Sequence, residues 1–158
     1  AKSGTLEIAN PQSKENFITL RILDSNIEDK IEFKDGKVIN YDAKEGLEVL
    51  KSIIEIKNGN YLGEVALVDK NSPISKSNIL FYETLYDENA SCHLAIGEAY
   101  PSCLKDGSAK SKTELFELGL NDSLEHVDFM IGTEDLQIEG ITADGKKIAI
   151  FKDGNFVI

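Results

Sequence analysis

Two polar side chains at positions 126 and 128 are spaced so that a strand would present them together. Residues 126–131 have the pattern of a strand, in which successive side chains point to opposite faces. His126 and Asp128 then share one face, while the other face is wholly apolar. An imidazole beside a carboxylate is a typical pair of metal ligands, but it also occurs as an ordinary hydrogen-bonded pair. The spacing alone leaves both interpretations open.

The other histidine lies in the segment Asp-Glu-Asn-Ala-Ser-Cys-His at residues 87–93. Polar residues followed by apolar ones predict a helix that begins near residue 87 and continues to about residue 99. Glu88 and His93 are five positions apart, which is not one helix face, so they converge only if Glu88 lies at or before the helix start. Otherwise Asp87 or Glu88 caps the helix and His93 is a satisfied core residue.

A third candidate, Glu64, interrupts the apolar run at residues 61–68, which predicts a buried strand with one carboxylate. Together the candidates form a set of nitrogen and oxygen donors that suits Zn²⁺, Co²⁺ or Mn²⁺. The set comprises Glu64, Glu88, His93, His126 and Asp128, with the phenol of Tyr100 as a further candidate. A single ion would not need so many carboxylates, so the count favours a two-metal hydrolytic site with one bridging carboxylate.

Competing kinds of site have weaker support. A structural zinc site from Cys92, His93, Cys103 and His126 has the wrong spacing, because ten residues separate the cysteines and the chain has no Cys-x-x-Cys pair. A Ser or Cys nucleophile assisted by either histidine stays conceivable, although Cys92 and His93 would point apart on a helix. The sequence contains none of the glycine-rich phosphate-binding motifs, nor Gly-x-Ser-x-Gly or His-Glu-x-x-His.

Composition restricts the class of protein. The chain has 158 residues, 41% of them hydrophobic, which is enough for one sizeable core, and we expect a single domain. The net charge of −11, without a basic cluster, argues against nucleic acid and anionic membranes as partners, and no apolar run reaches bilayer length. Two cysteines predict free thiols in a reducing cytoplasm. Because the chain starts at Ala1 without an initiator Met, we expect a piece excised from a longer protein.

The elements that position these residues are mostly strands. Alternation at residues 17–22 and 31–39, interrupted by Asp35-Gly36, predicts strands and a hairpin. A capping box from Asp42 to Glu45 predicts a core-packed helix that ends at Asn58-Gly59. Residues 79–86 could be helix or strand, and residues 101–122 predict a loop with a helical turn at 114–118. Strands at 126–131, 136–141, 147–151 and 156–158 predict an antiparallel meander. The fold class is therefore α+β, a mostly antiparallel sheet or partly closed barrel with two or three helices.

Several blocks of the sequence resemble the thermophilic-type metallo-aminopeptidases, the group of aminopeptidase T, aminopeptidase S and PepS. The resemblance runs in order from about residue 17 to the C-terminus. The blocks that carry it are Leu62-Gly63-Glu64-Val65-Ala66-Leu67-Val68, Ser72-Pro73-Ile74, Leu80-Phe81-Tyr82, Thr84-Leu85-Tyr86, Asp87-Glu88-Asn89-Ala90-Ser91-Cys92-His93, Asn121-Asp122-Ser123 and His126-Val127-Asp128-Phe129-Met130-Ile131-Gly132.

The resemblance implies a cytoplasmic, dimeric enzyme that removes N-terminal residues from peptides at a site with two metal ions. It makes Glu64 the bridging carboxylate, with Glu88, His93, His126 and Asp128 as the other ligands. Tyr100 matches a family tyrosine near the metals, either a weak ligand or a hydrogen-bond donor to the developing oxyanion. The family takes a further Glu ligand from a Glu-Glu-Val-Phe type segment upstream, and neither Glu7 nor Glu15 has that context.

From this resemblance we expect the chain to be the C-terminal, ligand-bearing domain of a larger aminopeptidase whose N-terminal domain is absent. Without the upstream ligand and the covering domain, the 158 residues should have little or no activity. The alternative is a non-catalytic, β-rich binding or dimerisation module in which both histidines are structural.

Overall fold

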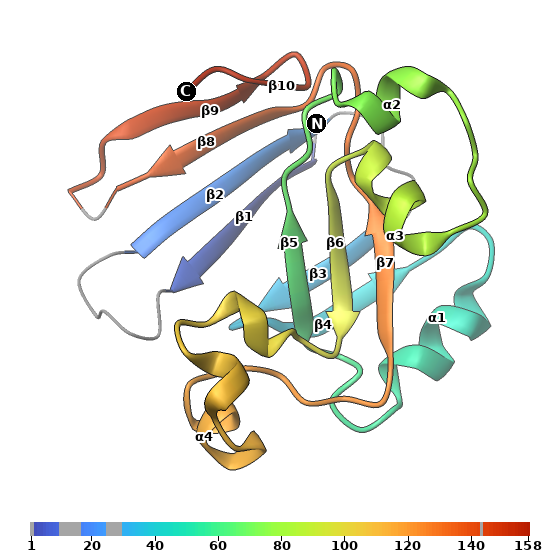
Figure 1. Cartoon of the computed structure of the whole chain (residues 1–158), viewed down its shortest axis with the longest axis vertical. Coiled ribbons are helices and arrows are strands. Elements are labelled where there is room, and N and C mark those ends of the chain that lie inside the picture. Colours follow the sequence, from blue (N-terminus) through green and yellow to red (C-terminus); the bar gives the residue numbers. More distant parts are fainter. Residues whose placement is uncertain (1, 10–16, 25–29, 143) are drawn as a thin grey trace. The chain divides into compact units, whose positions relative to one another are not determined.

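A computed structural model of the chain describes residues 2–9, 17–24, 30–142 and 144–158 (Figure 1). By its internal contacts the chain divides into two compact units. The first unit comprises residues 1–27, 66–93 and 130–158, and the second comprises residues 28–65 and 94–129.

The first unit is built on a five-stranded antiparallel sheet with the order β1-β2-β8-β9-β10. Its strands are β1 (Lys2–Ala9), β2 (Phe17–Asp24), β8 (Gln137–Ile141), β9 (Lys147–Lys152) and β10 (Asn155–Phe156). Leu136, Ile138 and Phe151 are almost fully buried in the core of this unit. The turn from β9 to β10 is Asp153-Gly154, both with positive φ, as two-residue hairpins require.

Short helices complete the first unit. Helix α2 (Pro73–Ser77) starts with proline, and the Ser72 hydroxyl accepts a hydrogen bond from the Ser75 N–H. The undecided stretch at 79–86 is a loop that leads into α3 (Thr84–Asp87), which the 3₁₀ turn η1 (Glu88–Ala90) follows directly. The Asp87 carboxylate accepts hydrogen bonds from the N–H groups of Phe81 and Glu83, so it orders the loop that precedes α3.

The second unit begins with the predicted hairpin. Strands β3 (Lys30–Lys34) and β4 (Lys37–Asp42) pair antiparallel across Asp35-Gly36, both with positive φ. Helix α1 (Leu47–Ile54) follows, but the predicted cap at Asp42 is wrong, because Asp42 is the last residue of β4 and Gly46 is the N-cap. The expected core packing of α1 is also only partial, since none of its residues is fully buried.

Segments between residues 62 and 130 form a three-stranded sheet with the order β5-β6-β7 (Figure 1). Its strands are β5 (Leu62–Ala66), β6 (His93–Gly97) and β7 (His126–Met130). The Gly97 N–H donates to the Tyr61 carbonyl and the Glu98 N–H to the Glu125 carbonyl, so the end of β6 lies beside the starts of both neighbours. Both pairings are therefore antiparallel.

This sheet corrects two predictions. The helix expected from residue 87 to residue 99 is wrong beyond the 3₁₀ turn, because residues 93–97 form the central strand β6 and are all buried. A short apolar run that is buried on every side carries no periodicity to separate strand from helix. In addition, β7 does not belong to the meander, since it pairs within this sheet and the meander consists of β8, β9 and β10. Strand β5 is half-buried rather than buried.

The predicted loop at 101–122 contains the 3₁₀ turns η2 (Pro101–Cys103) and η3 (Gly107–Ala109) and helix α4 (Lys112–Glu117). A capping box starts α4: the Ser111 hydroxyl accepts from the Glu114 N–H, and the Glu114 carboxylate accepts from the Ser111 N–H. The Ser111 hydroxyl and the Ser111 N–H both donate to the Glu114 carboxylate, and these two hydrogen bonds lower the pKa of Glu114 below its ordinary value of 4.5.

We expect Ser111→Ala to lower the melting temperature at neutral pH by roughly 3 °C, because the Glu114 N–H loses its acceptor. A carboxyl whose pKa is depressed by folding contributes stability above its unfolded pKa and loses it as the pH falls through the folded value. The difference between wild type and variant should therefore shrink below about pH 4.5. Thermal unfolding at pH 7 and pH 3 measures this, and an undiminished difference at pH 3 would exclude the Glu114 charge as its source.

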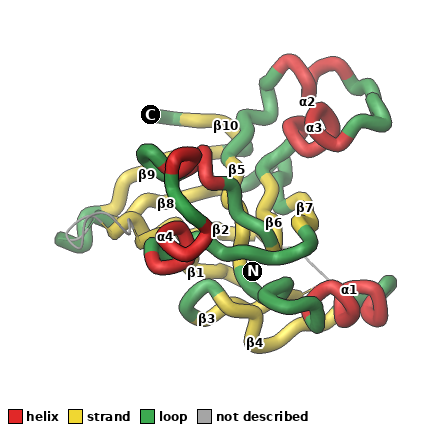
Figure 2. The backbone as a smooth tube through the Cα atoms, turned by 60° about the horizontal axis from the view of Figure 1, so that its bottom comes forward, coloured by secondary structure: helices red, strands yellow, loops and turns green. Residues whose placement is uncertain are grey.

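The α+β class is confirmed (Figure 2). Within the described residues the sheets are antiparallel and none closes into a barrel. Their α-helices are short, from four to eight residues. No helix in that part of the chain is long and apolar enough to cross a membrane.

Candidate metal centre

Three of the predicted ligands converge in the second unit. His126 and Asp128 lie on β7 and Glu64 lies in the middle of β5. The Nε2 atom of His126 is 3.3 Å from Oδ1 of Asp128 and 3.6 Å from Oε2 of Glu64. The alternation along β7 therefore places His126 and Asp128 together as predicted, and the Glu64 carboxylate approaches the same ring nitrogen.

The orientation of the His126 ring is set by a main-chain carbonyl. Its Nδ1 atom lies 2.7 Å from the carbonyl oxygen of Glu98. A carbonyl can only accept, so Nδ1 carries the hydrogen and, in the neutral ring, Nε2 presents a lone pair. That lone pair faces the two carboxylates. Metal-binding histidines are commonly held in this way, with the second ring nitrogen donating to a carbonyl or carboxylate.

Asp128 supplies the observation that tests whether these residues fit a metal. Its Oδ1 atom is buried and, among the described residues, has no hydrogen-bond partner. The nearby His126 Nε2 is within ion-pair distance, but the contact lacks hydrogen-bond geometry. A buried carboxylate oxygen without a donor is costly, and a cation relieves that cost. Two carboxylates and an imidazole nitrogen are the donors that Zn²⁺, Co²⁺ and Mn²⁺ accept, so the group fits a divalent ion.

Tyr100 belongs to the same neighbourhood. The centroid of its ring lies 4.9 Å from that of His126 at an interplanar angle of 47°. The residue is 47% exposed, so one side of its ring contacts the imidazole while much of its surface stays in solvent. This contact restricts the tilt of the His126 ring, while the Glu98 carbonyl restricts its rotation.

The remaining two predicted ligands, Glu88 and His93, belong to the first unit. Glu88 begins the turn η1 and is half-buried, and His93 begins β6 and is 1% exposed. A carboxylate oxygen of Glu88 and a ring nitrogen of His93 lie within 4.8 Å of each other. Glu88 and His93 come close despite their five-residue separation because a 3₁₀ turn leads from Glu88 into the strand that His93 begins. The predicted reason, that Glu88 precedes a helix containing His93, is wrong.

His93 repeats the arrangement of His126. Its Nδ1 lies 2.9 Å from the Ser91 carbonyl oxygen, so Nδ1 carries the hydrogen and Nε2 is the nitrogen left to coordinate. In both histidines Nδ1 therefore donates to a backbone carbonyl, and Nε2 is the ring nitrogen on the opposite side from that carbonyl.

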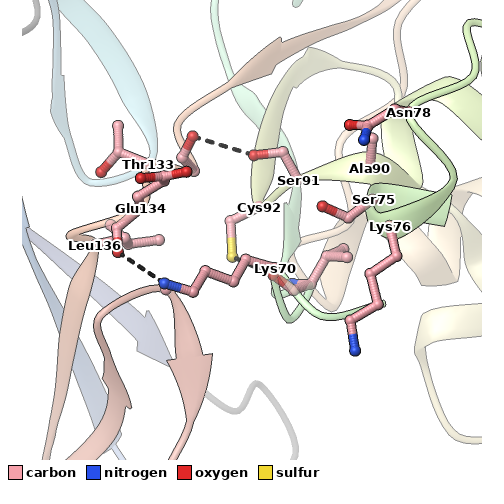
Figure 3. A pocket seen from close by; sticks show the side chains of 13 residues that line it. Lys70, Ser75, Lys76, Asn78, Ala90, Ser91, Cys92, Thr133, Glu134 and Leu136 are labelled. Atoms are coloured by element: carbon pink, nitrogen blue, oxygen red, sulfur yellow. Dashed lines mark hydrogen bonds between the residues drawn. The ribbon is translucent and has the colours of Figure 1, made fainter. Parts of the chain in front are cut away.

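A cavity of about 520 Å³ lies within the first unit beside the segment that joins Glu88 to His93 (Figure 3). Its walls include Lys70, Ser75, Lys76, Ser91, Cys92 and Glu134. The Ser91 hydroxyl donates to the Gly132 carbonyl, and the Cys92 sulfur lies 3.2 Å from the Val68 nitrogen. Burial raises the pKa of the Cys92 thiol, so at neutral pH it stays protonated and is a poor nucleophile. Both cysteines are free, and Cys103 is exposed.

Some contributors to the site have no side-chain signature in the sequence. The Glu98 carbonyl orients His126, and any residue type could have supplied it. The Asn121-Asp122-Ser123 run, which donates to the Gly97 carbonyl and to the Glu98 carboxylate, does have a signal in its consecutive polar residues before β7. Of the upstream acids considered from the sequence, Glu15 lies outside the described residues and the side chain of Glu7 is not described.

The donors of this candidate site fit one class of site, a divalent-metal centre with histidine and carboxylate ligands. Residues 20–156 match the family described as thermophilic metalloprotease (M29), and the chain belongs to this family. The resemblance of the sequence blocks to that group is thereby confirmed.

Named relatives agree with that assignment. The chain is 54% identical over 125 residues to Aminopeptidase 2 of Geobacillus stearothermophilus, covering 78% of this chain and 30% of the relative. Aminopeptidase AmpS of Bacillus subtilis (strain 168) has the same identity and coverage. Aminopeptidase T of Thermus aquaticus is 39% identical over 127 residues, with 80% and 31% covered.

A solved structure is similar as well. Wild-type AmpT from Thermus thermophilus matches with a TM-score of 0.71 and 32% identity, covering 91% of this chain and 40% of that one. The chain thus spans about 30% of the length of the curated relatives that it matches.

Proposed function

We propose that this chain supplies the metal ligands of a metal-dependent aminopeptidase that binds two divalent ions. In this proposal the ions would be held by Glu64, as the shared carboxylate, together with Glu88, His93, His126 and Asp128. The observation that carries it is the His126 ring, whose Nδ1 is tied to the Glu98 carbonyl while Nε2 faces the carboxylates of Glu64 and Asp128. Membership of a metalloprotease family supports the same conclusion.

The grouping of all five ligands in one centre is part of this proposal and rests on the family assignment. His93 is the first residue of the middle strand β6, Glu64 lies on its neighbour β5, and His126 and Asp128 lie on its other neighbour β7. Zn²⁺, Co²⁺ and Mn²⁺ all suit such a mixture of imidazole and carboxylate donors. Bound divalent ions supply a Lewis acid for the scissile carbonyl and make water available as a nucleophile near neutral pH.

The residues of the chain have distinct proposed tasks in the reaction. Glu64 would serve as a carboxylate ligand whose negative charge helps to hold the divalent ions. Tyr100, whose ring packs on His126, is proposed to donate from its hydroxyl to the oxyanion that develops on the substrate carbonyl. The surplus of acidic over basic residues, which gives a net charge of −11, attracts the ammonium group of a free peptide N-terminus.

We further propose a homodimeric, cytoplasmic enzyme that acts on peptides with a free N-terminus, in keeping with the aminopeptidase names of the relatives. The chain by itself should hydrolyse peptides poorly. It spans about 30% of the length of those relatives. A site with fewer ligands and more solvent binds metal ions less tightly and activates the attacking water less.

The test uses two proteins, each with and without Glu64→Gln. One is the 158-residue chain, and the other is a chimera in which residues 20–156 replace the matching part of the Bacillus subtilis relative. With Co²⁺ and leucine p-nitroanilide, we expect the chimera to be active and Glu64→Gln to reduce its kcat by about 100-fold or more. Glu117→Gln, an exposed carboxylate on α4, serves as the matched control and should change little.

Two results would contradict the proposal in different ways. A folded, metal-loaded chimera without activity would argue against the aminopeptidase assignment. Robust turnover by the 158-residue chain, abolished by Glu64→Gln, would instead show that the chain is sufficient. A folded chain and chimera that bind no metal would favour a β-rich module in which the histidines are structural.

A further inference from the structure

The segment Asn121-Asp122-Ser123 is tied to the backbone at the end of β6. The Asn121 side-chain amide donates to the Gly97 carbonyl at 2.6 Å, and the Ala99 N–H donates to the Asn121 carbonyl at 3.0 Å. The Ser123 N–H donates to the Glu98 carboxylate. Three consecutive residues at 97–99 are therefore held by residues 121 and 123.

These contacts surround the one carbonyl that orients His126. The Glu98 carbonyl oxygen accepts from His126 Nδ1 at 2.7 Å, while the N–H of the same residue donates to the Glu125 carbonyl at 2.7 Å. Gly97 has φ +104, a backbone conformation that residues with a side chain rarely adopt. This conformation sets the direction of the Gly97–Glu98 peptide. A peptide fixed on both sides keeps its carbonyl, and hence the imidazole, in one orientation.

The segment is anchored on its far side as well. The same Asn121 amide donates to the Asn58 carbonyl at 2.9 Å, so both of its hydrogens are used. Asn58 in turn donates to the Asp122 carbonyl at 2.9 Å, and the Ser123 hydroxyl donates to the Lys57 carbonyl at 3.1 Å. Asn121 thus joins the loop after α1 to the end of β6.

We propose that Asn121 is a positioning residue for His126: with Ser123 it fixes the Gly97–Glu98 backbone, so that the Glu98 carbonyl keeps the hydrogen on Nδ1 and Nε2 free. Among the described residues the hydrogen bonds of Asn121 go to the backbone of Asn58, Gly97 and Ala99 and not to a proposed ligand, so its proposed action is through the Glu98 peptide. The part of this proposal that concerns metal affinity rests on the proposed function, while the part that concerns the ring tautomer does not.

The tautomer is measured on the metal-free protein by long-range ¹H–¹⁵N NMR of the histidine rings. In the wild-type chain we expect His126 to carry its hydrogen on Nδ1, and Asn121→Ala to shift it to a mixture of both tautomers. Glu98→Ala, which removes the tie to Ser123 but keeps the carbonyl, should give a smaller shift in the same direction. If Asn121→Ala does not fold, the tautomer of His126 in Glu98→Ala still tests the proposal.

Metal affinity is the second readout, measured with Co²⁺ by competition against a chromophoric chelator. We expect Asn121→Ala to weaken binding by about 10-fold, as loss of an outer hydrogen-bond partner does in other metal sites. Ser111→Ala is the matched control, because it lowers stability without touching the Glu98 peptide, and its affinity and His126 tautomer should equal those of the wild type.

The two readouts separate the two proposals. If Asn121→Ala and Glu98→Ala both leave the His126 tautomer of the folded protein unchanged, the positioning role is overturned whether or not metal binds. If the tautomer shifts as expected but the wild type binds no Co²⁺, the positioning role stands and the metalloenzyme proposal fails.

Discussion

Replacing His126 with alanine is expected to weaken the binding of Zn²⁺ or Co²⁺ by more than about 100-fold. Loss of an outer hydrogen-bond partner already costs 10- to 100-fold in affinity, and His126 is proposed to coordinate directly. The change removes the imidazole nitrogen that lies within 3.6 Å of the Glu64 carboxylate and 3.3 Å of the Asp128 carboxylate. Competition with a chromophoric chelator measures the affinity, and circular dichroism shows whether the variant remains folded.

Tyr100→Phe is the matched control for this variant. Phenylalanine keeps the aromatic ring that packs 4.9 Å from the imidazole and removes only the hydroxyl. If Tyr100 donates to the developing oxyanion, the affinity for metal stays within about twofold while kcat falls by 10²- to 10³-fold in the active protein. Equal metal affinities of folded His126→Ala and wild type would contradict the proposed ligand role.

The second large effect is expected from Gly97→Ala, which should destabilise the protein by roughly 3 kcal/mol or more. Gly97 has φ +104, and a Cβ atom there would lie 1.9 Å from the Glu125 carbonyl oxygen. That oxygen already accepts the Glu98 N–H, so it cannot withdraw without loss of a hydrogen bond. For a chain of 158 residues the melting temperature should fall by roughly 6–12 °C.

Gly119→Ala separates backbone strain from the steric clash at Gly97. Gly119 follows α4 with φ +89, and nothing lies within 4 Å of the Cβ that alanine would add. Its replacement should cost only about 1 kcal/mol, the price of a left-handed backbone in a residue other than glycine. Comparable melting temperatures of the two variants would show that the contact with Glu125 does not determine the choice of glycine.

Local signals in the sequence were sufficient for most strands. The pairs Asp35-Gly36 and Asp153-Gly154 correctly indicate hairpins, because few other residues adopt positive φ at two successive positions. The alternation from His126 to Met130 correctly places His126 and Asp128 on one face. Such patterns succeed because the information lies in neighbouring residues.

Other features depend on contacts that are distant in sequence. The apolar residues that follow His93 form the central strand of a sheet, paired on its two edges with β5 and β7, and all of them are buried. The acidic residue Asp42 has the composition of a helix cap but pairs with Lys30 in a hairpin. The partner of His126 Nδ1 is a backbone carbonyl, which has no residue type to recognise.

The most direct test of the proposed centre is a crystal of the protein grown with Co²⁺ and examined by anomalous diffraction at the cobalt edge. We expect peaks at about 2.0–2.2 Å from Nε2 of His93, from Nε2 of His126 and from the carboxylates of Glu64, Glu88 and Asp128. Coordination through Nδ1 of either histidine, or peaks that involve none of these five residues, would contradict the proposed centre.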